Sequence, residues 1–386
     1  MQRELPTRLD SLTGLRFFAA WLVVAHHFSN FSALPFLWRY TGFGATGVTF
    51  FFVLSGFVLT WSFVPSDTAP RFYWRRFARI VPLHLVTTAI ALPVFYTWRD
   101  VPYDWSAITL SFLLLHAWVP YTTTYFAGNP ASWSLSCEMF FYALHPILVR
   151  GALALKLIGL ALLSVAVLFA IFVVARWSPE WFSARVVGWL LYISPLFRVG
   201  EFLLGIGLAA AMKRGFRVPV GVIPGVILVA LWFHLEYRLS PQYFHYEVGV
   251  LISNLSYVVL PLLYGTIIAA VVQLDFDGAR SVLRTKTMVS LGQWSYALYL
   301  IHASVIYVLL DLYGPQKYQM LESTLWFGLV TILSIGASAV LYTVIEHPIE
   351  QRLRQLQRTW IARRQPAAVT AATPTPAPAK TSTTDA

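Results

Sequence analysis

The sequence is poor in cysteine and in charge: its 386 residues include one cysteine, Cys137, and 12% charged side chains. A single cysteine excludes an internal disulfide. Because 58% of the residues are hydrophobic, a water-soluble domain could not bury them all, and the composition indicates a membrane protein. The sequence also lacks the ligand spacing of a metal site, a phosphate-binding glycine loop and the Gly-x-Ser-x-Gly motif of serine hydrolases. We therefore expect no bound metal.

Apolar runs of about 17 to 25 residues recur along the chain, which is the length at which a helix spans a bilayer. They predict an all-α polytopic integral membrane protein with about ten transmembrane helices, plus a short re-entrant or interfacial helix. The short run 105–119 is this extra helix, because a full span there would reverse the side of every later loop. The predicted spans are residues 13–31, 43–63, 80–97, 131–149, 157–175, 195–212, 219–236, 249–273, 289–311 and 323–345.

Basic residues are distributed unevenly between the two sides of the membrane. With the N-terminus in the cytoplasm, 20 of the 28 lysines and arginines lie in cytoplasmic segments, six in external segments, and Arg16 and Arg198 within spans. This bias follows the positive-inside rule and predicts that both termini are cytoplasmic. The net charge of +11 is thereby explained by topology, and we expect no nucleic-acid partner.

The chain is predicted to have three parts. Residues 1–12 form a cytoplasmic N-terminus, residues 13–350 form the membrane domain, and residues 351–386 form a cytoplasmic tail. The tail is basic at first and rich in alanine, threonine and proline after Gln365, a composition that predicts disorder because it cannot form a packed core. The first span is interrupted by histidines, so we expect it to be retained rather than cleaved as a signal peptide.

The first span carries Arg16 and the histidine pair His26 and His27. Ionisable groups inside a membrane are costly, and they usually serve a function or lie buried against other helices. Eleven residues are about 16 Å along a helix, close to three turns, so Arg16 and His27 share a face and His26 points elsewhere. Histidine takes up a proton near neutral pH, which makes His27 a candidate base. A snorkelling arginine with a packed histidine is the structural alternative.

A segment rich in arginine and aromatic residues, Arg71–Arg79, lies at the predicted cytoplasmic end of the third span. Arginine binds phosphate through two parallel hydrogen bonds, and aromatic faces can contact an adenine ring. Arg76 and Arg79 are therefore candidates for binding a nucleotide-linked substrate. The alternative interpretation is an ordinary positive-inside loop.

The segment Trp133–Glu138 lies at the external start of the fourth span and places Glu138 at about the depth predicted for His27. A carboxylate at this depth can orient a histidine, bind a sugar hydroxyl or pair with a basic residue. The neighbouring Cys137 is interpreted as a packing residue.

Further candidate site residues, all within predicted spans, are His26, Ser55, Trp133, Arg198, Glu201 and His302. Arg198 and Glu201 have the i, i+3 spacing of a helical ion pair. Ser55 precedes Gly56, which favours a tight helix contact over a nucleophile.

Seven segments, in this order, resemble the motifs of the membrane-bound acyltransferase-3 family, the O-acetylases of bacterial surface polysaccharides. The resemblance extends from about Leu9 to Glu350. It includes no appended periplasmic domain, so it indicates the stand-alone form of the family. The matching segments are GLRFFAAWLVVAHH, FFFVLSGFVL, FYWRRFARIVPLH, SWSLSCEMFFYALHP, FRVGEFLLG, SLGQWSYALYLIH and YTVIEHPIEQR.

The resemblance implies transfer of an acetyl group from cytoplasmic acetyl-CoA to a hydroxyl of an extracytoplasmic glycan, such as lipopolysaccharide O-antigen or exopolysaccharide. It implies a bacterial inner membrane location, with acetyl-CoA, the glycan and the lipid bilayer as partners. It makes His27 the catalytic residue and assigns Arg76 and Arg79 to the donor site. Arg16, Glu138 and His302 also occupy motif positions; we interpret Arg16 as a donor-site residue and Glu138 as a catalytic partner.

Two features depart from the family pattern. The histidine is doubled by His26, so the assignment to His27 depends on an ungapped register. His84 and His145 stand where the family more often has aromatic residues.

Two other functions fit the sequence. One is a proton-coupled secondary transporter with His27, Glu138 and Glu201 as its relay, although we find no internal repeat of the kind that transporters often have. The other is the same chemistry with a small-molecule acceptor or with succinyl-CoA as donor.

Overall fold

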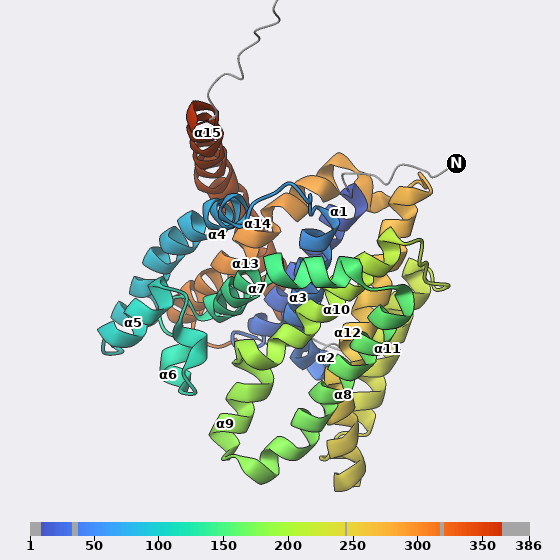
Figure 1. Ribbon diagram of the computed structural model, residues 1–386. Coiled ribbons are helices and arrows are strands. Elements are labelled where there is room, and N and C mark those ends of the chain that lie inside the picture. Colours follow the sequence, from blue (N-terminus) through green and yellow to red (C-terminus); the bar gives the residue numbers. More distant parts are fainter. Residues whose placement is uncertain (1–8, 33–37, 244, 317–319, 365–386) are drawn as a thin grey trace, which may run out of the picture.

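The computed structural model describes residues 9–32, 38–243, 245–316 and 320–364, and every regular element within these ranges is a helix. Figure 1 shows the helices gathered into one bundle. The prediction of an all-α polytopic membrane protein is confirmed. The predicted disordered segment after Gln365 and most of the N-terminal segment 1–12 lie outside the described residues.

Each of the ten predicted spans coincides with a helix. Seven helical segments in the described part of the chain are long and apolar enough to cross a membrane. Three helices at predicted spans, α1, α7 and α11, are not among those seven. The ten are α1 (Asp10–Phe28), α3 (Gly47–Trp61), α4 (Ala69–Leu92), α7 (Trp133–Ala154), α8 (Leu157–Trp181), α10 (Pro195–Lys213), α11 (Val222–Arg238), α12 (Tyr246–Phe276), α13 (Lys286–Tyr313) and α14 (Met320–Leu341).

The apolar run 105–119 does not form a continuous helix. Its helix α5 (Trp105–Phe112) has 8 residues, or about 12 Å, less than half of the hydrocarbon thickness of a bilayer. The chain then turns at Leu114, whose φ is 56°, and continues as a short 3₁₀ turn, His116–Trp118. This segment is therefore too short to cross a membrane as one helix. The other short helices are α2 (Trp38–Thr41), α6 (Thr122–Tyr125) and α9 (Ala184–Gly188).

Helix α1 lies at the centre of the bundle. It packs against α3, α12, α13 and α14, while α4 to α6 lie on one side of it and α8, α11 and α12 on the other (Figure 1). Its buried residues, among them Val23, Val24 and Phe28, contribute to the hydrophobic core. Arg16, His26 and His27 on the same helix are half-buried.

Helices α3 and α10 approach each other closely at two glycines. A Cβ added to Gly56 would lie 2.1 Å from the Phe202 carbonyl oxygen, and one added to Gly205 would lie 2.0 Å from the Val53 carbonyl oxygen. Both contacts are with backbone, which cannot move aside as a side chain can. Small residues that let helices touch are typical of helix packing in membranes. This contact confirms the tight packing expected next to Ser55.

We expect Gly205→Ala to destabilise the protein by about 1–3 kcal/mol, because the new methyl group forces the two helices apart. The measurement is the thermal unfolding of the detergent-solubilised protein, followed by size-exclusion chromatography. Gly151→Ala in α7 is the matched control, because no heavy atom lies within 4 Å of its added Cβ. Equal melting temperatures for the two variants would contradict the close approach.

Helix α15 (His347–Arg364) continues past the last predicted span and packs on α4. The Trp74 indole donates to the Leu353 carbonyl at 2.8 Å, and the Gln357 amide donates to the Arg71 carbonyl at 3.2 Å. Figure 1 shows the start of α1 and α15 at the same end of the bundle. This is the arrangement that an even number of crossings requires.

Candidate active site

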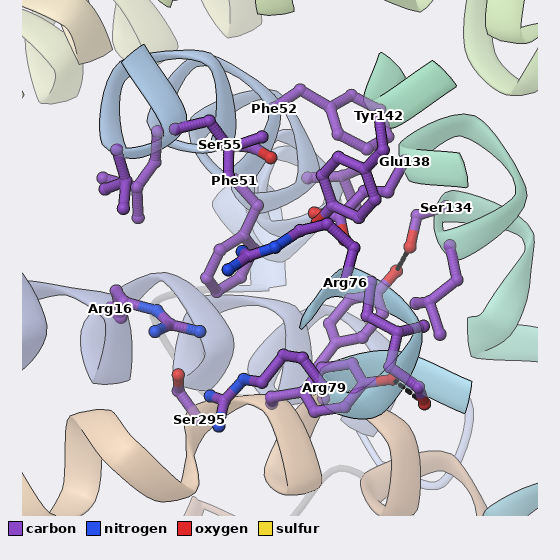
Figure 2. A pocket seen from close by; sticks show the side chains of 18 residues that line it. Arg16, Phe51, Phe52, Ser55, Arg76, Arg79, Ser134, Glu138, Tyr142 and Ser295 are labelled. Atoms are coloured by element: carbon purple, nitrogen blue, oxygen red, sulfur yellow. Dashed lines mark hydrogen bonds between the residues drawn. The ribbon is translucent and has the colours of Figure 1, made fainter. Parts of the chain in front are cut away.

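A cavity of about 150 Å³ lies between α1, α3, α4, α7 and α13 (Figure 2). We call it the arginine cavity, because the guanidinium groups of Arg16, Arg76 and Arg79 converge on it from α1 and α4. It therefore brings together five residues that the sequence singled out. Its polar lining consists of Arg16, Ser55, Arg76, Arg79, Ser134, Glu138, Tyr142, Ser295, Tyr296 and Tyr299.

The three arginines differ in how their charge is balanced. Arg79 is paired with two carboxylates, at 2.6 Å from Glu346 Oε1 and 2.9 Å from Glu350 Oε2. Within the described residues, neither Arg16 nor Arg76 has an acidic side chain within 4.0 Å. Since an unbalanced charge in a protein interior is costly, these two cations make the cavity suited to an anion.

Glu138 lies in the arginine cavity and is not in contact with His27. Its Oε2 accepts a hydrogen bond of 2.8 Å from the hydroxyl of Tyr142, one helical turn further along α7. In the part of the chain that the structure describes, no hydrogen bond connects Glu138 with His27. Glu138 thus lies with Arg16 and not beside His27, where the sequence placed it.

His27 pairs with His302 of α13. The Nδ1 atom of His27 is 3.1 Å from the Val23 carbonyl oxygen, and Nδ1 of His302 is 2.7 Å from the Tyr299 carbonyl oxygen. A carbonyl only accepts, so Nδ1 carries the proton on both rings. His302 Nε2 is then a bare acceptor, 3.2 Å from His27 Nδ1.

This pattern leaves Nε2 of His27 with a free lone pair. The His27 side chain is half-buried, and no described residue hydrogen-bonds to this atom. An imidazole with Nδ1–H held and Nε2 open is the arrangement that a general base requires.

His26 has a different environment. Its Nδ1 is 2.9 Å from the carbonyl oxygen of Thr41, so it connects the end of α1 to α2. His26 thus has a different hydrogen-bond partner from His27, although the two rings remain neighbours, with 4.9 Å between their centroids. The contact gives His26 a structural role.

Tyr299 lies between the arginine cavity and the histidine pair. Its hydroxyl forms a 2.8 Å hydrogen bond with Ser134 on the cavity wall, and its ring centroid is 6.0 Å from that of His302. Along α1, Arg16 and His27 are eleven residues apart, which corresponds to about 16 Å. Arg16, in the wall of the arginine cavity, and the His27 imidazole therefore lie on the same helix, at a separation that a short extended organic chain can span.

Arg198 and Glu201 form a separate buried cluster. Their side chains are 2.9 Å apart, and Thr49 of α3 donates to Glu201 at 3.1 Å. The guanidinium group also lies over the rings of Phe52 and Tyr192. Trp133 packs on the same two rings. The expected ion pair is present, and it joins α3, α7 and α10 without lining the arginine cavity.

Several lining residues escaped the sequence reasoning. Tyr142 follows Glu138 at i, i+4 spacing, which could have identified it. Glu350, which does not line the cavity but pairs with Arg79, was also missed, because the two residues lie far apart along the chain. Cys137 is buried and its thiol donates to the Ile193 carbonyl at 3.2 Å, as expected for a packing residue.

The model of a family described as an acyltransferase domain matches residues 9–343. Over 364 residues the chain is 34% identical to Acyltransferase MdmB of Streptomyces mycarofaciens, which covers 88% of this chain and 91% of that protein. No solved structure matches the chain.

Two further relatives are longer than this chain. The chain is 24% identical over 378 residues to the peptidoglycan O-acetyltransferase OatA of Listeria monocytogenes, covering 89% of this chain and 56% of the relative. It is 27% identical over 336 residues to the putative peptidoglycan O-acetyltransferase YrhL of Bacillus subtilis, covering 77% and 48%. The chain thus spans about half of the length of these two relatives.

Proposed function

Because the chain belongs to this acyltransferase family, we propose that it transfers an acetyl group from acetyl-CoA to a hydroxyl of a cell-surface glycan. Two relatives that are named peptidoglycan O-acetyltransferases support a carbohydrate acceptor. The proposal locates the protein in the bacterial cytoplasmic membrane, with both termini and the donor on the cytoplasmic side. The excess of basic residues in the predicted cytoplasmic segments supports this orientation.

One observation carries the proposal: α1 holds an unbalanced cation, Arg16, in a cavity and, three turns later, an imidazole with an open Nε2, His27. The phosphates of the donor are anions that Arg16 and Arg76 attract. The pantetheine arm is a long, thin chain that extends from those phosphates toward the histidine pair. The thioester at its end then meets the base.

In the proposed reaction, Nε2 of His27 takes the proton of the acceptor hydroxyl as its oxygen attacks the thioester carbonyl carbon. The new C–O bond forms, the C–S bond breaks, and the leaving thiolate takes the proton back from the imidazolium. His302 holds the reactive tautomer by accepting from His27 Nδ1. Attack by Nε2 itself, through an acyl-histidine, is the second route to the same ester.

The transporter alternative receives less support. A proton relay requires connected groups, but Glu201 is bonded to Arg198 and Glu138 to Tyr142. Among the described residues, no hydrogen bond links either carboxylate to His27.

The test uses inverted membrane vesicles from cells that produce the chain, supplied with acetyl-CoA labelled in the acetyl group. We expect label in the carbohydrate fraction for the wild type and none for His27→Ala. Parallel samples with labelled succinyl-CoA, and extraction of small molecules before counting, separate the alternatives of donor and acceptor. Label that remains on the donor in every sample would contradict acyl transfer.

A further inference from the structure

A second cavity, of about 410 Å³, lies beside the arginine cavity. It is formed by the end of α3, the loop that follows it, the first turns of α4, His145 of α7 and Arg354 of α15. The two cavities share Leu59 and Arg76 in their walls. They are therefore neighbouring compartments, a wide one at the ends of the helices and a narrow one deeper in the bundle.

The wide cavity has a strongly positive lining, with four arginines facing one carboxylate, Asp67. Arg75 is paired with Asp67, and Arg354 is paired with Glu350. In the described ranges, Arg71 and Arg76 have no acidic side chain within 4.0 Å. A ligand with several negative charges would balance these two cations.

The wall of the same cavity carries an unused polar atom among aromatic rings. His145 is fully buried and stacks on Phe72 at 5.1 Å between ring centroids. Its Nδ1 has no hydrogen-bond partner among the described residues. Phe63 adds a second, half-buried ring. Since a buried polar atom without a partner is costly, it points to a ligand that combines a flat ring with a hydrogen-bonding group.

We propose that the wide cavity binds the nucleotide end of the acyl donor, an adenosine bisphosphate carrying further phosphate. The proposal rests on the proposed function and extends it by assigning a separate place to each end of the donor. Arg71 binds the phosphate of the nucleotide, and the diphosphate lies at Arg76, where Arg16 of the arginine cavity also attracts it. The adenine ring lies against Phe63 and His145. The slender pantetheine arm passes Arg76 into the arginine cavity. Aromatic walls favour a nucleotide over the phosphate headgroup of a lipid, which shares the anionic chemistry.

The kinetic test compares two donors that differ only in the nucleotide, acetyl-CoA and S-acetylpantetheine. Because Arg71→Glu replaces a charge-assisted hydrogen bond with a repulsion, it should raise the KM for acetyl-CoA by about tenfold or more. In this variant the kcat with acetyl-CoA should equal that of the wild type, and so should both kinetic constants with S-acetylpantetheine. Arg352→Glu is the matched control, because Arg352 is an exposed arginine of α15 outside the cavity lining. Equal effects of Arg71→Glu on both donors, or no effect on either, would overturn the assignment.

A binding measurement keeps the site testable if no acyl transfer is detected. Labelled adenosine 3′,5′-bisphosphate is added to the full chain in phosphatidylcholine nanodiscs, and we expect saturable binding that Arg71→Glu weakens at least tenfold. Binding without transfer would refute the proposed acetyl-CoA reaction and retain the nucleotide site. No binding by the wild type would overturn the site itself. Nanodiscs containing phosphatidylglycerol identify the other source: if this lipid abolishes nucleotide binding, the cavity is a headgroup site.

Discussion

Replacing His27 with alanine is expected to lower acyl transfer by about 10²–10⁴-fold, the usual contribution of a general base, or to abolish it if His27 carries the acyl group. The reason is that Nε2 of His27 is the open lone pair of the histidine pair, whereas His302 Nε2 faces His27 Nδ1. The measurement is the O-acetyl content of the glycan by NMR in a deletion strain that produces each variant. Size-exclusion profiles of the solubilised protein establish that the variant is folded.

His26→Ala is the matched control for this prediction. It removes a neighbouring imidazole from the same helix, but one that is bonded to the Thr41 carbonyl. We expect this variant to retain part of its activity, with a loss of stability at the contact between α1 and α2. If His27→Ala were as active as the wild type, the proposed base would be wrong. If His26→Ala alone were inactive, the base would have to be assigned to His26.

The second large effect distinguishes two arginines of the same motif. Arg79→Ala leaves the buried carboxylate of Glu346 without its partner, and breaking such a pair costs about 3–5 kcal/mol. Arg76→Ala removes a cation that has no carboxylate partner among the described residues. We therefore expect Arg79→Ala to lose folded protein, and Arg76→Ala to fold but to raise the KM for acetyl-CoA about ten- to hundredfold.

The measurements are the yield and melting temperature of each solubilised variant and the KM for acetyl-CoA in vesicles. The double variant Arg79→Ala with Glu346→Gln provides the control, because it removes both charges and should recover part of the lost stability. An unchanged KM in Arg76→Ala would remove this residue from the donor site. A stable Arg79→Ala would mean that the ion pairs of Arg79 with Glu346 and Glu350 contribute little to stability.

The sequence was sufficient to predict the helices, because the length and the apolar content of a span are local properties. It also predicted that His26 and His27 point in different directions, since helical spacing fixes this. The position of Glu138 was harder to predict. Its place along α7 follows from the sequence, but its neighbours depend on how α7 packs against α1 and α4, and this packing puts it beside Arg16 and not beside His27.

Charge balance in the arginine cavity could not be predicted either. Arg76 and Arg79 belong to one short motif and look equivalent in the sequence, yet one is paired with Glu346 and Glu350 and the other is not. The partners come from the far end of the chain, and which arginine faces them depends on the rotation of α4. The wide cavity was missed for the same reason, because α15 supplies part of its wall.

Because α15 packs on α4, the part of the chain that forms the candidate site extends beyond the family match. The family match ends at residue 343, before either carboxylate that contacts Arg79 and before Arg354. A protein shortened to that boundary would lose Arg354 from the wall of the wide cavity and would leave the Arg79 guanidinium group without its counterions. Fusion partners and affinity tags should therefore be attached beyond residue 364, so that α15 and its part of the wide cavity are kept.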